Sequence, residues 1–184
     1  MMDLLIETSG EIGYLALIRE KSVIAFCEIV PPKRQSQELL PQLSTLFQKN
    51  HVTLEEVQNI LIGIGPGAFT GTRIGAMVAK TLSFTHNIPL IPFCSLEGSL
   101  HEESGAVITD AKAGYLYLLQ ADEPELITPN NLPQNLPLYT PDPLLAQKHN
   151  LNLQPFSPQT VALRASSKKK ITWKELKLPY LRKI

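Results

Sequence analysis

The chain is poor in the residues and patterns on which several protein classes depend. Its 184 residues include two cysteines, Cys27 and Cys94, which lie far apart and match no metal-binding spacing. No apolar run approaches the length of a membrane-spanning helix, and Asp3 and Glu7 stand where a secretory signal would be basic. These absences argue against membrane and secreted classes and predict a globular protein of the reducing cytoplasm.

The side-chain groupings of common catalytic sites are also missing. The four histidines are isolated in the sequence, whereas two metal-binding histidines on one helix would lie three or four residues apart. Serines, cysteines and histidines form no recognisable nucleophile motif, although residues distant in sequence could still form a triad. We therefore expect no catalytic, cofactor-binding or metal-binding residues in this chain.

The strongest pattern that is present is a strand, a glycine-rich turn and a helix over residues 59–84. The apolar run at 60–64 has no polar alternation, which is typical of a strand covered on both faces. Thr70 is placed to cap the following helix through its hydroxyl. Phosphate-binding motifs fit poorly, because the turn has no lysine and no Asp or Glu occurs from Asn59 to Leu96. The residues alone favour a tight turn whose glycines serve backbone geometry.

Two predicted helices, 36–49 and 71–85, have more apolar or small surface than one sheet contact requires. On the second helix we expect Ile74, Val78 and Leu82 to face the sheet. Small residues recur there at every fourth position and would then face outward, where a partner helix could pack closely: Gly71, Gly75, Ala79 and Ser83. The first helix has a wide apolar arc: Leu39, Leu40, Leu43, Leu46 and Phe47. These residues are the predicted partner interface, and core packing within the monomer is the alternative.

The order of predicted elements in the first part of the chain is βββαβαβα. Three strands separated by hairpin-length turns open it. A helical turn with capping-box spacing at 53–56 precedes the central strand. The predicted ranges are 3–9, 12–19 and 22–30 for the opening strands, 36–49 and 71–85 for the long helices, 90–93 for the next strand and 95–102 for a short helix.

Residues 106–120 repeat the opening hairpin in outline. Glu7 and Asp110 precede the respective turns, and each turn is followed by a Gly-Tyr pair. The echo alone leaves both duplication and chance open, because strand turns share chemistry. We expect Asp110 and Lys112 to shape the second turn, since an acid there commonly bonds nearby backbone N–H groups.

The last third of the chain has a different composition. Eight of the fifteen prolines lie between Pro129 and Pro179, which predicts irregular connections and few long helices. Eight of the seventeen Lys and Arg residues occur from Arg164 onward, where Glu175 is the only acidic residue. Basic residues interleaved with Trp173 suit contacts with RNA phosphates. A solvated terminus and an acidic partner protein are the alternatives.

The central stretch GPGAFTGTRIG, residues 65–75, resembles the GPGSFTGxRIG segment of the TsaB (YeaZ) family. Other segments agree in the same order: LLIETS at 4–9 resembles the opening ILAIDTS, and QSQELLP at 35–41 resembles HSQxLLP. The resemblance covers residues 1 to about 120. This chain departs from the family at Gln35, where histidine is common, and it has Glu7 where actin-like ATPases have aspartate.

The resemblance implies an α/β, actin-like ATPase (ribonuclease H-like) fold that contains a duplication. Residues 1–103 would form the N-terminal lobe with the order βββαβαβα. Residues 104–184 would form a reduced second lobe with proline-rich connections and a basic C-terminal tail.

The resemblance also implies a function. TsaB proteins are accessory subunits in the synthesis of N6-threonylcarbamoyladenosine in tRNA, in which TsaC makes threonylcarbamoyl-adenylate and TsaD transfers the threonylcarbamoyl group. We expect a non-catalytic subunit that pairs with a TsaD-type partner through its two helices and is joined by a TsaE-type ATPase. Contact with tRNA would be indirect or through Lys168, Lys169 and Lys170, and the isolated chain could form a homodimer. The alternatives are an independent actin-like ATPase or phosphotransferase using Glu7, and an RNA-binding module acting through the basic tail.

Overall fold

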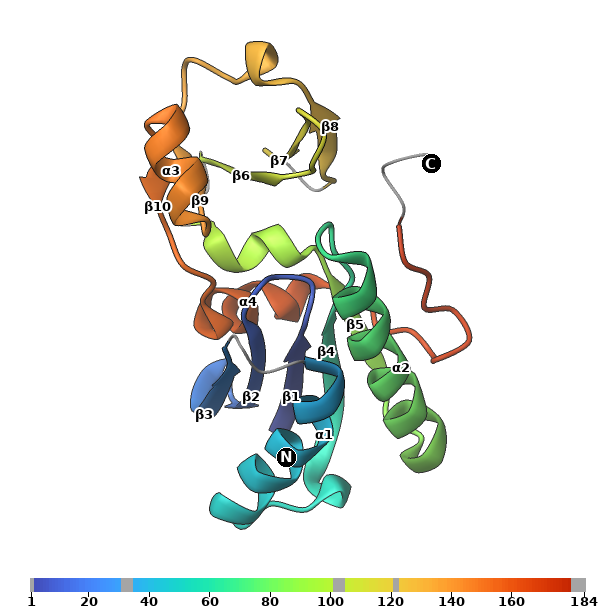
Figure 1. Cartoon of the computed structure of the whole chain (residues 1–184). Helices are drawn as coiled ribbons and strands as arrows, with labels where there is room; N and C mark the ends of the chain where they lie inside the picture. The colour runs from blue at the N-terminus through green and yellow to red at the C-terminus, as the bar shows by residue number, and fades with distance from the viewer. Residues whose placement is uncertain (1, 31–34, 101–104, 121–122, 180–184) are drawn as a thin grey trace.

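The structure, a computed structural model, describes residues 2–30, 35–100, 105–120 and 123–179. Two five-stranded sheets lie one above the other in Figure 1, each with its own core. The first sheet has the strand order β3-β2-β1-β4-β5. Its strands are β1 (Met2–Glu7), β2 (Gly13–Arg19), β3 (Ser22–Ile29), β4 (Val57–Gly63) and β5 (Leu90–Phe93). β1, β2 and β3 form an antiparallel meander, and β1, β4 and β5 are parallel.

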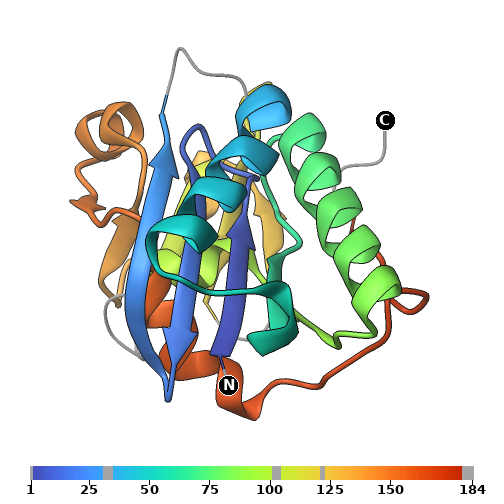
Figure 2. The ribbon, with the colours of Figure 1, turned by 90° about the horizontal axis from the view of Figure 1, so that it is seen from below.

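Two helices cover one face of this sheet, α1 (Gln35–Lys49) and α2 (Phe69–His86). They lie side by side in Figure 2. Leu4 and Ile6 of β1 point toward them, because alternate residues of a strand face opposite sides. Leu39, Leu43 and Leu46 of α1 complete this core with a spacing of four and three residues.

The far face of the first sheet is covered by α4 (Pro158–Arg164), which comes from the end of the chain. Ser157 caps this helix by accepting a hydrogen bond from the Thr160 N–H, and Pro158 occupies its first turn. Val161 and Ala162 pack there against Leu5 of β1 and its neighbours. β1 and β4 are therefore buried on both faces, as the apolar run at 60–64 predicts.

The second sheet has the order β10-β9-β6-β7-β8. Its strands are β6 (Ala106–Asp110), β7 (Leu116–Leu119), β8 (Glu125–Ile127), β9 (Leu138–Thr140) and β10 (Asn152–Leu153). One short helix, α3 (Pro143–His149), packs against β9 and β10, and the 3₁₀ helix η2 (Ser95–Ser99) joins the two lobes. The second sheet thus has little helical cover.

Several details differ from the predictions. The helix expected at 95–102 is the five-residue 3₁₀ helix η2, and residues 101–104 lie outside the described residues. Thr70 does not cap α2, because the helix begins at Phe69, two residues earlier than expected, and its N-cap is Ala68. The turn at 53–56 is confirmed: the Thr53 N–H donates to the Glu56 carboxylate at 2.9 Å.

The end of the chain returns to the first lobe. β5 meets Ile171 through two backbone hydrogen bonds of 2.8 Å between Leu90 and Ile171, and Leu176 is buried in the core beneath α1 and α2. The division proposed from the sequence places 104–184 in the second lobe, but α4 and residues 168–178 pack on the first. This packing is long-range, so no local pattern in the sequence reveals it.

Within the residues that the structure describes, no helix is both long enough and apolar enough to cross a membrane.

Candidate functional site

The end of β1 is fastened to the start of α2. Thr8 Oγ1 donates to the Gly71 carbonyl at 2.8 Å, and the Ala68 N–H donates to the Ser9 carbonyl at 2.6 Å. The backbones are in contact here: a Cβ placed on Gly71 would overlap the Thr8 carbonyl, and one on Gly75 would overlap the Thr8 hydroxyl. Glycine is therefore required at both positions for the close approach of helix and strand.

The outward orientation expected for the small residues of α2 is wrong. Gly71, Gly75, Ala79 and Ser83 are all buried in the monomer. Ile74, Val78 and Leu82, expected beneath the helix, lie half-buried at its sides and pack against the core. The physical reason is that α2 rests directly on β1 and β4, and only side chains of minimal size fit between them.

Most of the predicted residues of α1 also belong to the core. Leu39, Leu43 and Leu46 are buried, and Phe47 packs against them. Leu40 differs, with 58% of its surface exposed. Among the predicted interface residues of the two helices, Leu40 is therefore the one with a large apolar surface available to a partner.

Two apolar side chains of α2 that the sequence analysis did not assign to the partner interface are exposed. Phe69 is 48% exposed and Met77 68% exposed, and the Arg73 guanidinium lies 3.6 Å from the centre of the Phe69 ring. A spacing of four residues places Phe69, Arg73 and Met77 on one outer stripe. That spacing was visible in the sequence, but the small-residue stripe has the same spacing, and only one of the two stripes can face outward.

The exposed residues of the two helices belong to one side of the molecule. The helices begin next to each other, because the Gln35 side chain lies against Gly71 and also donates to the Gly10 carbonyl at 2.9 Å. We call Leu40, Phe69 and Met77 the exposed apolar face. Scattered apolar residues are normal at protein surfaces, but a set on adjacent helices is typical of interaction sites.

Glu7, the acid at the position where related ATPases use aspartate, is enclosed. It is 2% exposed, and its Oε1 accepts from the Ser9 N–H at 2.5 Å. A Cβ on Gly63 would overlap its carboxyl group, and the Ser95 hydroxyl lies on the same side. Burial raises the pKa of Glu7 above its usual value, and hydrogen bonding to Ser9 and Ser95 only partly opposes this shift. The position fits a buried structural acid better than a metal-binding or catalytic carboxylate.

The described part of the chain brings together no group of three histidine, cysteine, aspartate or glutamate side chains that could hold a metal ion. Asp110 shapes its turn as predicted. Its Oδ1 accepts from the Lys112 backbone N–H at 2.8 Å, and its Oδ2 from the Lys112 ammonium at 2.7 Å.

Glu97, on η2, links the connection between the two lobes to residues near the end of the chain. It is 5% exposed, and its Oε1 accepts from the Cys94 N–H at 2.9 Å and from Lys168 Nζ at 2.8 Å. Arg164 Nε lies 3.7 Å from Oε2. Lys168, predicted to contact tRNA, is thus engaged inside the protein, whereas Lys169 and Lys170 are exposed.

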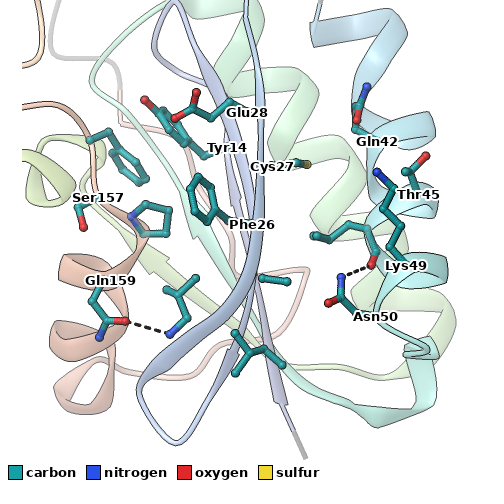
Figure 3. Close-up of a pocket in the computed structure, with 16 residues that line it drawn as sticks. Tyr14, Phe26, Cys27, Glu28, Gln42, Thr45, Lys49, Asn50, Ser157 and Gln159 are labelled. Carbon is teal, nitrogen blue, oxygen red and sulfur yellow. Dashed lines mark hydrogen bonds between the residues drawn. The ribbon is translucent and has the colours of Figure 1, made fainter.

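A groove of about 720 Å³ follows the free edge of β3 (Figure 3). β3 lies between Lys49 of α1 and the residues that begin α4. Gln159 covers one end of the edge: its Oε1 accepts from the Val23 N–H at 2.9 Å, and its Nε2 donates to the Lys21 carbonyl at 2.8 Å. The groove is on the β3 side of α1, away from α2, so it is separate from the exposed apolar face.

Comparisons with known proteins agree with this architecture. A family model described as "TsaD: tRNA N6-adenosine threonylcarbamoyltransferase" matches residues 28–130, more than half of the chain. The chain therefore belongs to this family, whose fold is that of the actin-like ATPases. Two solved YeaZ-type structures from Pseudomonas aeruginosa share the fold. One has a TM-score of 0.81 at 22% identity and covers 98% of this chain and 99% of that one. The other has a TM-score of 0.76 at 20% identity and covers 95% and 96%.

Within the family, the chain is similar to proteins named "tRNA threonylcarbamoyladenosine biosynthesis protein TsaB". It is 33% identical to the Bacillus subtilis protein over 122 residues, which are 64% of this chain and 53% of that protein. It is 28% identical to the Escherichia coli protein over 124 residues, covering 64% and 53%. The resemblance to TsaB (YeaZ) is thus confirmed, and the chain spans about half the length of the curated relatives it matches.

Proposed function

We propose that this chain is a non-catalytic subunit in the synthesis of N6-threonylcarbamoyladenosine in tRNA, and that it binds a TsaD-type catalytic partner. The TsaB names of its relatives support the pathway. The same pathway suggests a cytoplasmic protein. A TsaE-type ATPase as a further partner, and a homodimer of the isolated chain, remain predictions from the resemblance.

The observation that carries the proposal is the exposed apolar face. Leu40, Phe69 and Met77 are held on two helices that the sheet already fixes in place, so a partner would meet a preorganised surface. Apolar and aromatic side chains on rigid elements are the usual anchors of protein interfaces, and methionine is enriched there. We assign partner binding on α2 to this face, because the small residues predicted to bind the partner are buried in the monomer.

A non-catalytic role is consistent with the surroundings of Glu7. A catalytic or metal-binding carboxylate must reach its substrate or ion, whereas Glu7 is closed off by Gly63 and Ser95. We therefore assign the chemistry to the partner subunit, and no observation favours the independent ATPase.

The test is binding of a TsaD-type protein to the double variant Leu40→Lys, Met77→Lys. Both side chains are exposed, so the free energy of unfolding should change by less than about 0.5 kcal/mol. We expect the Kd for the partner to rise at least about tenfold, since each lysine would be desolvated at the interface.

The matched control is Leu144→Lys on α3, where the leucine is 79% exposed but lies in the second lobe. The control should bind the partner as the unmodified chain does. Normal binding by the double variant, or equal weakening by the control, would show that the partner docks elsewhere.

A further inference from the structure

The basic segment near the end of the chain, residues 168–178, is held against the first lobe. In Figures 1 and 2 it follows the β5 side of the sheet and passes beside α2. Both backbone hydrogen bonds between Leu90 and Ile171 measure 2.8 Å, and Leu176 is 3% exposed. Trp173 meets the Phe84 ring edge-on with centroids 5.2 Å apart. The segment is therefore fixed by the backbone and by apolar side chains.

Two acidic side chains that contact this segment, Glu175 and Glu97, are already engaged. Glu175 accepts from the Thr172 N–H and from the Thr172 hydroxyl, both at 2.8 Å, which ties its carboxylate into a local turn. Glu97 is occupied by Lys168 at 2.8 Å. Four lysines of the segment are exposed: Lys169, Lys170, Lys174, whose Nζ lies 5.6 Å from the centre of the Trp173 ring, and Lys177.

The type of surface indicates the type of partner. The apolar residues of the segment are turned toward the protein, since Leu176 is buried and Ile171 and Trp173 are half-buried in the core contact. What remains outside is mainly lysine charge, beside the Phe84 ring of α2, which is 64% exposed and meets Trp173. Protein interfaces depend on buried apolar or aromatic anchors and are depleted in lysine. Binding of nucleic-acid phosphates needs positive charge above all.

We propose that Lys169, Lys170, Lys174 and Lys177 form a binding site for the phosphate backbone of RNA. That this RNA is a tRNA rests on the proposed function. Because the segment is anchored at Leu90 and in the core, little backbone entropy is lost on binding. Lysine–phosphate contacts position an RNA without reading its sequence, so this surface would hold the tRNA body while a partner recognises the target base.

The test is binding of an unmodified tRNA transcript to the full chain at salt concentrations from roughly 50 to 200 mM. In the triple variant Lys169→Ala, Lys170→Ala, Lys174→Ala we expect at least a tenfold rise in Kd. The slope of log K against log salt should become shallower by about one for each lysine removed. A thermal melt checks that the variant is folded.

The matched control is Lys21→Ala, Lys49→Ala, Lys148→Ala, which removes the same charge from exposed positions on other surfaces. It should bind tRNA within about twofold of the unmodified chain, because screening limits the reach of exposed charges to about 10 Å. Equal weakening by both triple variants would overturn the site, and so would failure of the unmodified chain to bind tRNA in this salt range. Lysine-dependent binding of the partner protein without tRNA binding would show an acidic protein surface instead.

This test is separate from that of the proposed function. The triple variant should bind the TsaD-type partner normally, because its lysines are outside the exposed apolar face. A negative result for Leu40→Lys, Met77→Lys would leave the tRNA titration unchanged, and a negative tRNA titration would leave the partner measurement unchanged.

Discussion

At the scale of single residues, Glu7 lies where actin-like ATPases have a functional aspartate, but its carboxyl group is not accessible. The strand end, the turn and the carboxyl group are all present. Gly63 leaves no space above the carboxyl group, and the Ser9 N–H accounts for one of its oxygens. Burial destabilises the ionised form of Glu7 and raises its pKa. The free energy of unfolding should therefore depend on pH through this residue.

We predict that Glu7→Gln stabilises the chain at neutral pH and loses this advantage in acid. The unfolded carboxyl has its usual pKa of 4.5, and the folded one is higher, so the folded state binds the proton more tightly. The contribution of Glu7 is therefore fully present below that usual pKa and is lost as the pH rises through the folded value. Glutamine stays neutral throughout. Each 1 kcal/mol recovered should raise the Tm by about 2–4 °C.

Thermal melts of both proteins between about pH 4 and pH 8 measure this difference. Glu20→Gln, a change at an exposed turn, is the control and should show no such trend. If the Tm difference between Glu7→Gln and the unmodified chain did not grow with pH, Glu7 would be ionised in the folded state.

At the scale of elements, periodicity predicts the helices and strands of the first lobe but not the orientation of α2. The apolar run of β4 permits one interpretation, whereas the arc of α1 left partner interface and core packing open, and most of it is core. In α2, the small residues and Ile74, Val78 and Leu82 could each have formed the buried side. The contact between Gly75 and Thr8 decides it, and that contact joins residues far apart in the sequence. The exposed apolar face depends on the same choice, which is why Met77 was not assigned to the partner interface from the sequence.

The second lobe shows a different limit. α3 and α4 are seven residues long, too short for a convincing period. Their starts were nevertheless marked in the sequence, since Asp142-Pro143 and Ser157-Pro158 both combine a capping residue with proline at the first helical position. The packing of α4 on the first sheet had no such marker, because it depends on the path of the whole chain.

We predict that Gly75→Leu destabilises the isolated chain. The leucine side chain would enter the space held by the Thr8 hydroxyl and Ile62, so α2 would have to move away from β1. Overpacking of this kind costs about 1–3 kcal/mol or more. Urea denaturation measures it, with Thr81→Leu on the exposed side of the same helix as control. A Gly75→Leu chain of unchanged stability would restore the outward orientation predicted from the sequence.

At the scale of the whole molecule, the first sheet is completed from both ends of the chain. The opening meander supplies three of its strands, and the closing third supplies the cover of its far face and the partner of β5. Glu97 stands where these parts meet, on the connection between the lobes. The position of the basic segment, and with it the proposed RNA site, therefore depends on a residue that is itself remote from the surface.

The last prediction concerns this connection. Glu97→Ala removes the acceptor of the Cys94 N–H and of Lys168, and the negative charge 3.7 Å from Arg164 Nε. The two cations can still reach solvent, so the loss in the free energy of unfolding should be about 1–3 kcal/mol, smaller than for a fully buried pair.

The effect should be local as well as global, because the freed segment contains several lysines. Trypsin should therefore cut between Lys168 and Lys177 faster than in the unmodified chain, while the rest of the molecule stays resistant. Lys112→Ala is the control: it removes the exposed pair with Asp110, in which the lysine side chain is 81% exposed, and should leave both stability and trypsin cleavage nearly unchanged. Unchanged trypsin cleavage in Glu97→Ala would mean that Ile171 and Leu176 hold the segment without help from Glu97.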